Sequence, residues 1–369
     1  MPPAFSPDAL SPSSKRTALR IFALLTALFS LGVSLIAQTA PSIPGIAVEQ
    51  TIPAIDAPDQ NGHLQTLSSL TGKQGLLLLF SRSADWCPYC KMHLVQLGQA
   101  QSLFEAKGIH VASITYDSQA ILKDFSARKG ITYPMLSDTD SKTIRAFGIL
   151  NPEGKGFAAG IPYPGIYLIS PDGRVHKRFF ESQYSDRFTP NDIYADIFGT
   201  LPASTQQQPR VEAPHVAIQV SQSDATAGAG SRIKLLVKID PATHVHLYAP
   251  GAEKNGYKVV KLELSGSPDF RVEPMEYPQS KLYTFVALHE TVPVYTEPTV
   301  LSQDIVVAAT KDFVGAIGTG RSLHIEGKLL YQACNDHECF SPVQQPVSWD
   351  VKVLPFDRMR SPEALQHKD

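Results

Sequence analysis

The chemistry of this 369-residue chain is concentrated in its four cysteines, which fall into two close pairs. Cys87 and Cys90 have two residues between them, and Cys334 and Cys339 have four. Thiols this close together can form a local disulfide, and its reversible opening and closing transfers two electrons. The spacing therefore predicts two local disulfides and not one bridge between distant segments.

The first pair stands where an apolar run meets an amphipathic segment. Residues 75–80 read GLLLLF, which predicts a buried strand, and residues 91–108 repeat apolar residues at helical spacing. The free N–H groups at the start of a helix stabilise a thiolate there. We therefore predict Cys87 as the exposed nucleophile and Cys90, one turn further on, as the thiol that resolves a mixed disulfide.

Two other interpretations of this pair are weaker. So short a disulfide ring constrains the unfolded chain little, which argues against a structural bridge. A zinc site using both cysteines and His93 has no evident fourth ligand nearby. His93 and Lys91 are predicted to be ordinary solvated residues.

Residues 45–181 resemble the redoxin (AhpC/TSA-like) branch of the thioredoxin superfamily. The resemblance is carried by FSRSADWCPYC, YPMLSDTDSKTIRAFGI and GIPYPGIYLISPDG. It implies a cis-proline facing the cysteine pair, at Pro164, where the backbone can pair with a substrate segment. Trp86 and Tyr163, beside these residues, are predicted to bind substrate.

The resemblance has departures that bear on the reaction. Peroxiredoxins carry Thr or Ser three residues before the reactive cysteine and a proline seven residues before it, and this chain has Ala84 and Phe80. Disulfide exchange is therefore favoured over peroxidase activity. Ser81 replaces the buried aspartate of thioredoxins, which leaves the proton-transfer group for Cys90 open, and Asp85 is predicted to lie at the surface.

The second pair lies in LLYQACNDHECFSPV. This segment resembles the N-terminal periplasmic domain of DsbD, a bacterial thiol–disulfide interchange protein, and the likeness extends over residues 216–354. The matching residues are Tyr331, Gln332, Cys334, Cys339, Phe340 and Pro342. The resemblance implies an electron shuttle under a cap, with Phe285 and Leu288 as candidate shields. A static structural disulfide stays open as an alternative, and His337 is predicted to be an exposed loop residue.

Periodicity divides the chain into two parts of different class. Strand-like and helix-like segments alternate over residues 45–198, which predicts an α/β thioredoxin-like domain. Short period-two strands follow a polar stretch, which predicts an all-β immunoglobulin-like sandwich. The predicted organisation is a signal peptide or signal-anchor (1–40), a redoxin domain (41–199), a linker (200–214), a β-sandwich (215–356) and a tail (357–369).

The N-terminus and the overall charge indicate where the protein acts and which partners are excluded. Lys15, Arg16 and Arg20 precede an apolar run at residues 21–37, the pattern of an export signal, with cleavage or retention left open. A formal net charge of −2 without a basic stripe argues against a nucleic-acid partner. No flavin or nicotinamide fingerprint is present, so we expect no cofactor.

These features predict an extracytoplasmic thiol:disulfide oxidoreductase that relays electrons between the two pairs. Its expected partners are exported or thioredoxin-fold proteins with disulfides, and a membrane electron donor of the DsbD or CcdA type. Two alternatives remain: a peroxiredoxin-like thiol peroxidase reduced by the sandwich, and a binding module with a static second disulfide.

Overall fold

The computed structural model describes residues 44–203, 205, 207–285 and 289–368. Residues 43–369 form one compact unit. The predicted export segment at residues 1–40 lies outside the described residues, and so does the candidate shield Leu288. Across the part of the chain that is described, no helix is long and apolar enough to span a membrane.

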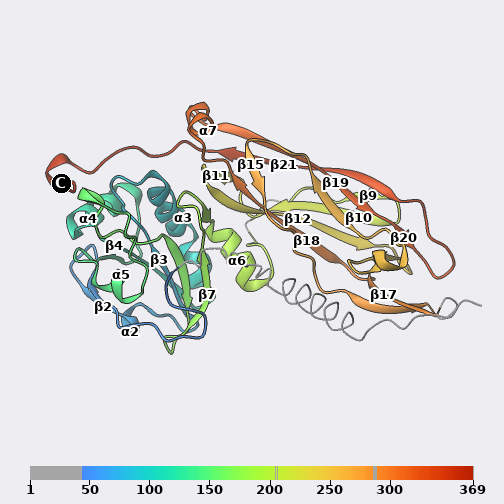
Figure 1. The fold of residues 1–369 in the computed structure, drawn as a ribbon, viewed down its shortest axis with the longest axis horizontal. Coiled ribbons are helices and arrows are strands. Elements are labelled where there is room, and N and C mark those ends of the chain that lie inside the picture. Colours follow the sequence, from blue (N-terminus) through green and yellow to red (C-terminus); the bar gives the residue numbers. More distant parts are fainter. Residues whose placement is uncertain (1–43, 204, 206, 286–288, 369) are drawn as a thin grey trace, which may run out of the picture. The chain divides into compact units, whose positions relative to one another are not determined.

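The first part of the unit, here called the α/β region, is built on a five-stranded sheet with the order β5-β4-β3-β6-β7 (Figure 1). β3 pairs in parallel with β4, and antiparallel with β6. The strands of this five-stranded sheet are β3 (Gly75–Phe80), β4 (Ile109–Thr115), β5 (Met135–Ser137), β6 (Gly165–Ile169) and β7 (Val175–Phe180). The other elements of the region are β1 (Asp56–Pro58), β2 (Leu64–Thr66), α2 (Leu67–Leu70), α3 (Pro88–Glu105), α4 (Gln119–Lys129), α5 (Lys142–Ala146), η1 (Gly156–Ala158), β8 (Arg187–Phe188) and α6 (Pro190–Phe198).

β3 is central because its six residues are all buried. Leu77 and Leu79 pack in one apolar cluster with residues of α3, α4 and α6, and Leu76 and Leu78 pack in a second cluster. A continuous apolar strand therefore serves two cores at once, as the sequence predicts. The α/β arrangement expected for this region is confirmed.

The second part, here called the β region, consists almost entirely of strands in several sheets. Its sheet orders are β15-β18-β12-β10-β9, with β8 joined to β12, then β11-β21-β19-β14 and β16-β17-β13-β20. The strands are β9 (Val211–Ala213), β10 (Val216–Gln222), β11 (Thr226–Ala227), β12 (Ser231–Pro241), β13 (His246–Tyr248), β14 (Lys261–Leu264), β15 (Phe270–Val272), β16 (Lys281–Phe285), β17 (Glu290–Tyr295), β18 (Thr299–Val307), β19 (Arg321–Tyr331), β20 (Ala333–Cys334) and β21 (Val343–Val353). Short helical turns are η2 (Ala252–Asn255), α7 (Lys311–Ala316) and η4 (Glu363–Leu365).

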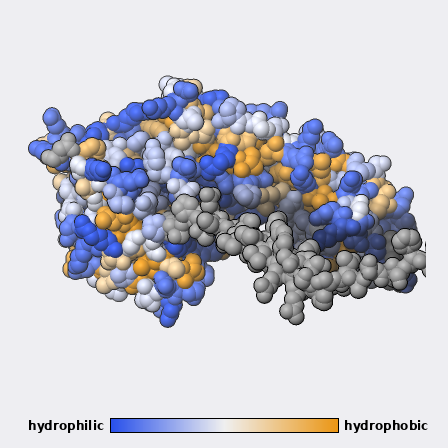
Figure 2. Space-filling model, in the orientation of Figure 1, coloured by the Kyte–Doolittle hydropathy of each residue, from blue (hydrophilic) through white to orange (hydrophobic). Residues whose placement is uncertain are grey.

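Alternation in the β region follows its sequence. On β21 the side chains of Trp349, Val351 and Val353 are fully buried, whereas Asp350 and Lys352 are exposed. A single apolar cluster joins these residues to β10, β12, β18 and β19. Figure 2 shows hydrophilic residues interspersed with smaller hydrophobic patches on one face of the molecule.

The predicted linker and tail both make defined contacts. Residues 211–213 of the predicted linker form β9 and pair with β10. Three residues are too few for periodicity to reveal a strand. The tail also makes defined contacts, since Asp357, Met359 and Arg360 all bond to the α/β region.

Candidate functional site

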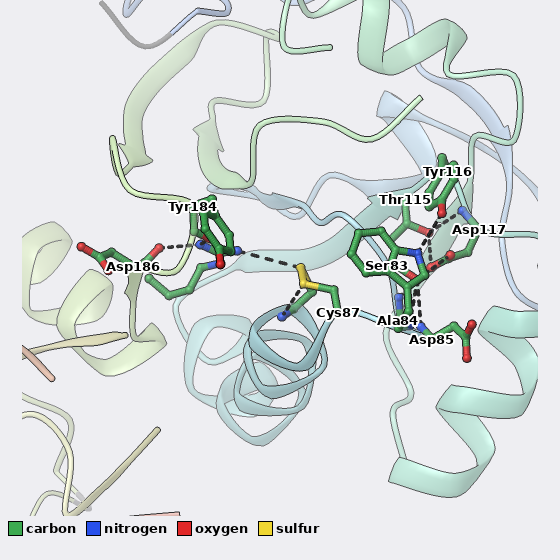
Figure 3. Close-up of a disulfide and its surroundings, with 12 residues drawn as sticks. Ser83, Ala84, Asp85, Cys87, Thr115, Tyr116, Asp117, Tyr184 and Asp186 are labelled. Carbon is green, nitrogen blue, oxygen red and sulfur yellow. Dashed lines mark hydrogen bonds between the residues drawn. A yellow bond between two sulfur atoms is a disulfide. The ribbon is translucent and has the colours of Figure 1, made fainter. Parts of the chain in front are cut away.

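The first cysteine pair is a disulfide at the start of α3. Cys87 is the N-cap residue of the helix, in an extended backbone conformation, and Pro88 opens the first turn. The Cys87 Sγ atom accepts a hydrogen bond from the backbone N–H of Cys90 at 3.3 Å. Figure 3 shows Cys87 at the end of the helix, with Tyr184 and Asp186 on one side and the Asp117 group on the other. The predicted position at a helix N-terminus is thus the observed one.

Both cysteines of this pair are buried, with 2% of Cys87 and none of Cys90 exposed. The expectation of an exposed Cys87 is wrong for the disulfide form. Beside the pair, the guanidinium of Arg82 lies 4.9 Å from the Trp86 ring centroid and 5.2 Å from that of Tyr184. Because both cysteines are buried, a substrate disulfide reaches their sulfurs only after neighbouring groups move.

Arg187 also lies beside the first pair, and the sequence analysis did not single it out. Its side chain is buried, and Nη2 lies 3.9 Å from the Sγ atom of Cys90. Burial, and then the charge of nearby Arg82, lower the pKa of Arg187 to about 9. At neutral pH the guanidinium is therefore still a cation beside sulfur. The residue follows a polar stretch, and no motif marks it in the sequence.

Lys91 and His93 are not solvated, contrary to the sequence-based expectation. Lys91 is 1% exposed and donates to the carbonyl of Met359 at 2.7 Å. His93 is 2% exposed, and burial followed by the charge of Arg187 lowers its pKa to about 3. His93 is therefore neutral at physiological pH and adds no positive charge to the site.

Asp85 also departs from its expected surface position. The side chain is fully buried, and Oδ2 accepts hydrogen bonds from Arg360 Nε at 2.9 Å and Nη2 at 2.5 Å. The backbone N–H of Ser361 donates to Oδ1 at 2.7 Å. Burial alone raises the pKa of Asp85, but these bonds outweigh it and hold the pKa below its usual value. The C-terminal tail thus satisfies a carboxylate two residues from Cys87.

A second buried carboxylate, Asp117, fixes the loop before α3. Asp117 accepts hydrogen bonds from the Ser83 hydroxyl at 2.9 Å and from the backbone N–H of Ala84 at 2.6 Å. His367 Nε2 of the tail lies 2.7 Å from Asp117 Oδ1, and its ring stacks on Tyr116. Ala84, at the position where peroxiredoxins carry a hydroxyl, is therefore held by this backbone bond and by the apolar cluster that buries its side chain.

Pro164 lies beside the end of β3, because Gly165 pairs with Phe80. The Tyr163–Pro164 bond is trans, and no cis bond occurs among the described residues, so the expected cis-proline is wrong. The N–H of Tyr163 donates to the carbonyl of Ile149 at 2.7 Å and fixes the approach to Pro164. The trans form is also the intrinsically favoured one for X–Pro bonds. Trp86 is partly buried, with Nε1 donating to the Tyr116 hydroxyl at 2.8 Å.

The second cysteine pair is a disulfide between β20 and the loop that follows it. Cys334 is buried, whereas Cys339 is exposed. The hydroxyl of Tyr248 lies 3.5 Å from the Cys339 Sγ atom. Phe285 packs at the edge of the apolar cluster that contains Cys334, which agrees with a shielding position. His337 is exposed, as predicted.

The structure does not bring the two pairs together. At one end of β12, Ser231 pairs with Arg187, which touches Cys90. At the other end, Pro241 pairs with Val216, beside His215, whose ring stacks on that of Phe340 at 3.6 Å. Because β12 has 11 residues, these ends are roughly 35 Å apart. The two pairs thus lie near opposite ends of β12 in this arrangement.

Comparisons with known proteins found a similar family, similar individual proteins and similar solved structures. Residues 48–178 match the AhpC/TSA family. The chain is 25% identical over 144 residues to 1-Cys peroxiredoxin PER1 of Triticum aestivum, covering 37% of this chain and 65% of that protein. It is 24% identical over 164 residues to the thiol-disulfide oxidoreductase ResA of Geobacillus thermodenitrificans, covering 44% and 86%. The solved structure of peroxidoxin BcpB from Mycobacterium tuberculosis gives a TM-score of 0.36 at 20% identity, covering 41% of this chain and 93% of that one.

This chain therefore spans just under two thirds of the Triticum aestivum protein and most of ResA. The region carrying Cys87 and Cys90 lies within the residues that match the AhpC/TSA family. The matches support a thiol oxidoreductase enzyme, as the spacing of the cysteines predicts.

Proposed function

We propose that this protein is an exported thiol–disulfide oxidoreductase that reduces disulfides in other exported proteins through Cys87 and Cys90. The observation that carries the proposal is the Cys87–Cys90 disulfide at the start of α3, with a cation at Cys90. Both the helix N-terminus and the cation favour thiolates, the reactive form in exchange.

The reaction begins from the reduced pair. The Cys87 thiolate attacks one sulfur of the substrate disulfide, and the other substrate sulfur leaves as a thiolate and takes a proton from water. The Cys90 thiolate then attacks Cys87 Sγ, the Cys87–Cys90 bond forms, and the second substrate sulfur leaves. The substrate gains two electrons and the cysteine pair loses two.

A thiol peroxidase is the second candidate, because a relative of this chain is named a 1-Cys peroxiredoxin. In that reaction the Cys87 thiolate attacks peroxide and becomes a sulfenic acid, which Cys90 then converts to the disulfide. The side chain at position 84 offers no hydroxyl to the peroxide, since Ala84 bonds only through its backbone. This difference makes disulfide exchange the preferred proposal.

The β region, in this proposal, is an immunoglobulin-like sandwich of the DsbD N-terminal type that receives electrons at Cys334 and Cys339 from a membrane donor. The exposure of Cys339 supports such docking. Because the two pairs lie at opposite ends of β12, the sandwich pair passes its electrons to the first pair of another molecule. The segment at residues 1–40 directs the chain out of the cytoplasm.

One experiment separates the two candidate reactions. The chain from residue 41 onward, with Cys334 and Cys339 replaced by Ser, is reduced and mixed either with a disulfide-containing protein or with hydrogen peroxide. We expect rapid oxidation of Cys87 by the protein disulfide and slow oxidation by millimolar peroxide. Oxidation by peroxide within seconds, without reaction toward the disulfide, would establish the peroxidase instead.

A further inference from the structure

The charge of Arg187 has no counterion hydrogen-bonded to it. Nη1 donates to the carbonyl oxygens of Tyr184 at 2.5 Å and Asp186 at 2.6 Å, and Nη2 donates to Cys90 Sγ at 3.9 Å. The hydrogen bonds from the Arg187 side chain to the described residues thus all go to uncharged atoms. A buried cation is costly unless an anion lies close to it. The group best placed to supply that anion is the sulfur of Cys90, once the disulfide is reduced.

The other charged groups around Arg187 leave the surroundings of Cys90 positive. Arg82 adds a second cation. The nearby carboxylates are each engaged elsewhere: Asp186 pairs with Arg271 at 3.0 Å, and Glu181 pairs with Arg232 at 2.7 Å. Tyr89 and His93 also lie near Arg187; burial raises the pKa of Tyr89 and lowers that of His93, so both are neutral.

The β region holds the segment that carries Arg187. The N–H of Arg187 donates to the carbonyl of Gly230 at 2.8 Å, and β8 continues the sheet through β12. Gly230 has φ +82°, and a Cβ atom there would lie 2.2 Å from the carbonyl oxygen of Ser185. The backbones therefore approach so closely that only glycine fits. The Asp186–Arg271 pair adds a second contact to the same segment.

We propose that Arg187 is a catalytic residue of the first pair, stabilising the thiolate of Cys90, and that the β region completes this site by holding Arg187 in place. The inference rests on the proposed disulfide exchange. When Cys90 attacks Cys87 Sγ and frees the reduced substrate, Arg187 stabilises the attacking thiolate. When an external dithiol reduces the pair again and Cys90 leaves, the same contact stabilises the leaving group.

The first test measures the pKa of the Cys90 thiol by thiolate ultraviolet absorbance. Replacing Cys87, Cys334 and Cys339 with Ser leaves Cys90 as the only thiol. In this background Arg187→Met is expected to raise the pKa of Cys90 by about one unit or more, a tenfold loss of thiolate near neutral pH. Arg187→Lys keeps the charge and is expected to restore part of the shift.

Arg174→Met provides the matched control, because Arg174 is an exposed arginine in the β6–β7 turn. Its replacement is expected to leave the pKa of Cys90 unchanged. An unchanged pKa in Arg187→Met would overturn the assignment, and so would an equal shift in the control. Circular dichroism of each variant verifies that the chain is folded.

The second test asks whether the β region sets the site. Gly230→Ala forces the segment at residues 185–187 away, and the milder Arg271→Ala removes only the ion pair with Asp186. Both are expected to raise the pKa of Cys90, by less than Arg187→Met does. If Gly230→Ala does not fold, the pKa of Cys90 in Arg271→Ala alone decides whether the β region sets the site. An unshifted pKa in every folded variant would contradict the role of the β region.

These pKa measurements need no substrate, so they fail or succeed independently of the proposed function. A chain that reduces no disulfide, yet shows the Arg187 shift, would disprove the proposed function and leave the Arg187–Cys90 contact standing. If the chain reduces disulfides but Arg187→Met leaves the pKa of Cys90 unchanged, the proposed function stands and the role of Arg187 is disproved.

Discussion

The two cysteine pairs lie in opposite surroundings. The Cys87–Cys90 pair caps a helix, is buried on both residues and faces the cation of Arg187. The Cys334–Cys339 pair joins a strand to a loop, exposes one of its residues and has neutral aromatic groups around it. In the proposed function, we expect charge to control reactivity at the first pair, and accessibility to control it at the second. The difference suits a first pair that performs exchange within a closed site and a second pair that docks to other proteins.

The largest effect is expected from removing the nucleophile of the first pair. With a chemical dithiol as reductant, Cys87→Ser is expected to lower the rate of protein-disulfide reduction by a factor of about 10³ or more, because the nucleophile is lost. The Cys334→Ser/Cys339→Ser chain serves as the matched control and is expected to retain the rate. Equal loss in both would mean that the pairs do not have separate roles. The assay is the turnover of a disulfide-bonded protein.

The separation of the pairs can be tested kinetically. A chain with its second pair reduced and its first pair oxidised is diluted over a hundredfold range, and oxidation of the second pair is followed. Exchange between molecules is expected to slow in proportion to concentration, because the pairs of one chain lie at opposite ends of β12. A rate independent of concentration would show that they meet within one chain.

The tail contact offers a smaller effect on stability. Arg360→Ala leaves the buried carboxylate of Asp85 with a single backbone donor, and we expect it to lower the free energy of unfolding by about 1–2 kcal/mol. The partial exposure of Arg360 keeps the loss small, because water reaches the site. Arg358→Ala, an exposed neighbour, is expected to change stability by less than about 0.5 kcal/mol. Urea unfolding measures both.

The pH dependence of this contact has a definite sign. The pKa of Asp85 in the folded chain lies below its ordinary value, so the contact stabilises the fold above about pH 4 and is lost as the pH falls further. The difference in unfolding free energy between the parent and Arg360→Ala is therefore expected to shrink below about pH 4. A difference that grew in acid would contradict the assignment.

The smallest effect is expected at the second pair. Burial raises the pKa of Tyr248, so its hydroxyl keeps the proton and can donate to a Cys339 thiolate. In a Cys334→Ser chain, Tyr248→Phe is expected to raise the pKa of Cys339 slightly, by the few-fold effect of one hydrogen bond. Tyr295→Phe, which also loses a bonded hydroxyl, is the control and should have no effect. If Tyr248→Phe raised the pKa of Cys339 as much as Arg187→Met is expected to raise that of Cys90, the two pairs would not differ in how their thiolates are stabilised.

Local patterns predicted most of what lies close in sequence. The apolar run of β3, the helix that starts at Cys87 and the β6–β7 hairpin follow from periodicity and turn residues. The burial of Lys91 and Asp85 could not be predicted, because their partners in the tail lie 268 and 275 residues further along the chain. The position of Arg187 beside Cys90 could not be predicted for the same reason, because it depends on the pairing of β8 with β12.

The reduction potential of the Cys87–Cys90 pair tests the account most directly. It is measured on the Cys334→Ser/Cys339→Ser chain by equilibration with thiol–disulfide buffers of known potential. A disulfide reductase is expected to lie nearer the thioredoxin value of about −270 mV than the DsbA value of about −120 mV. A potential near −120 mV would make the first pair an oxidant and would contradict the proposed direction of electron flow.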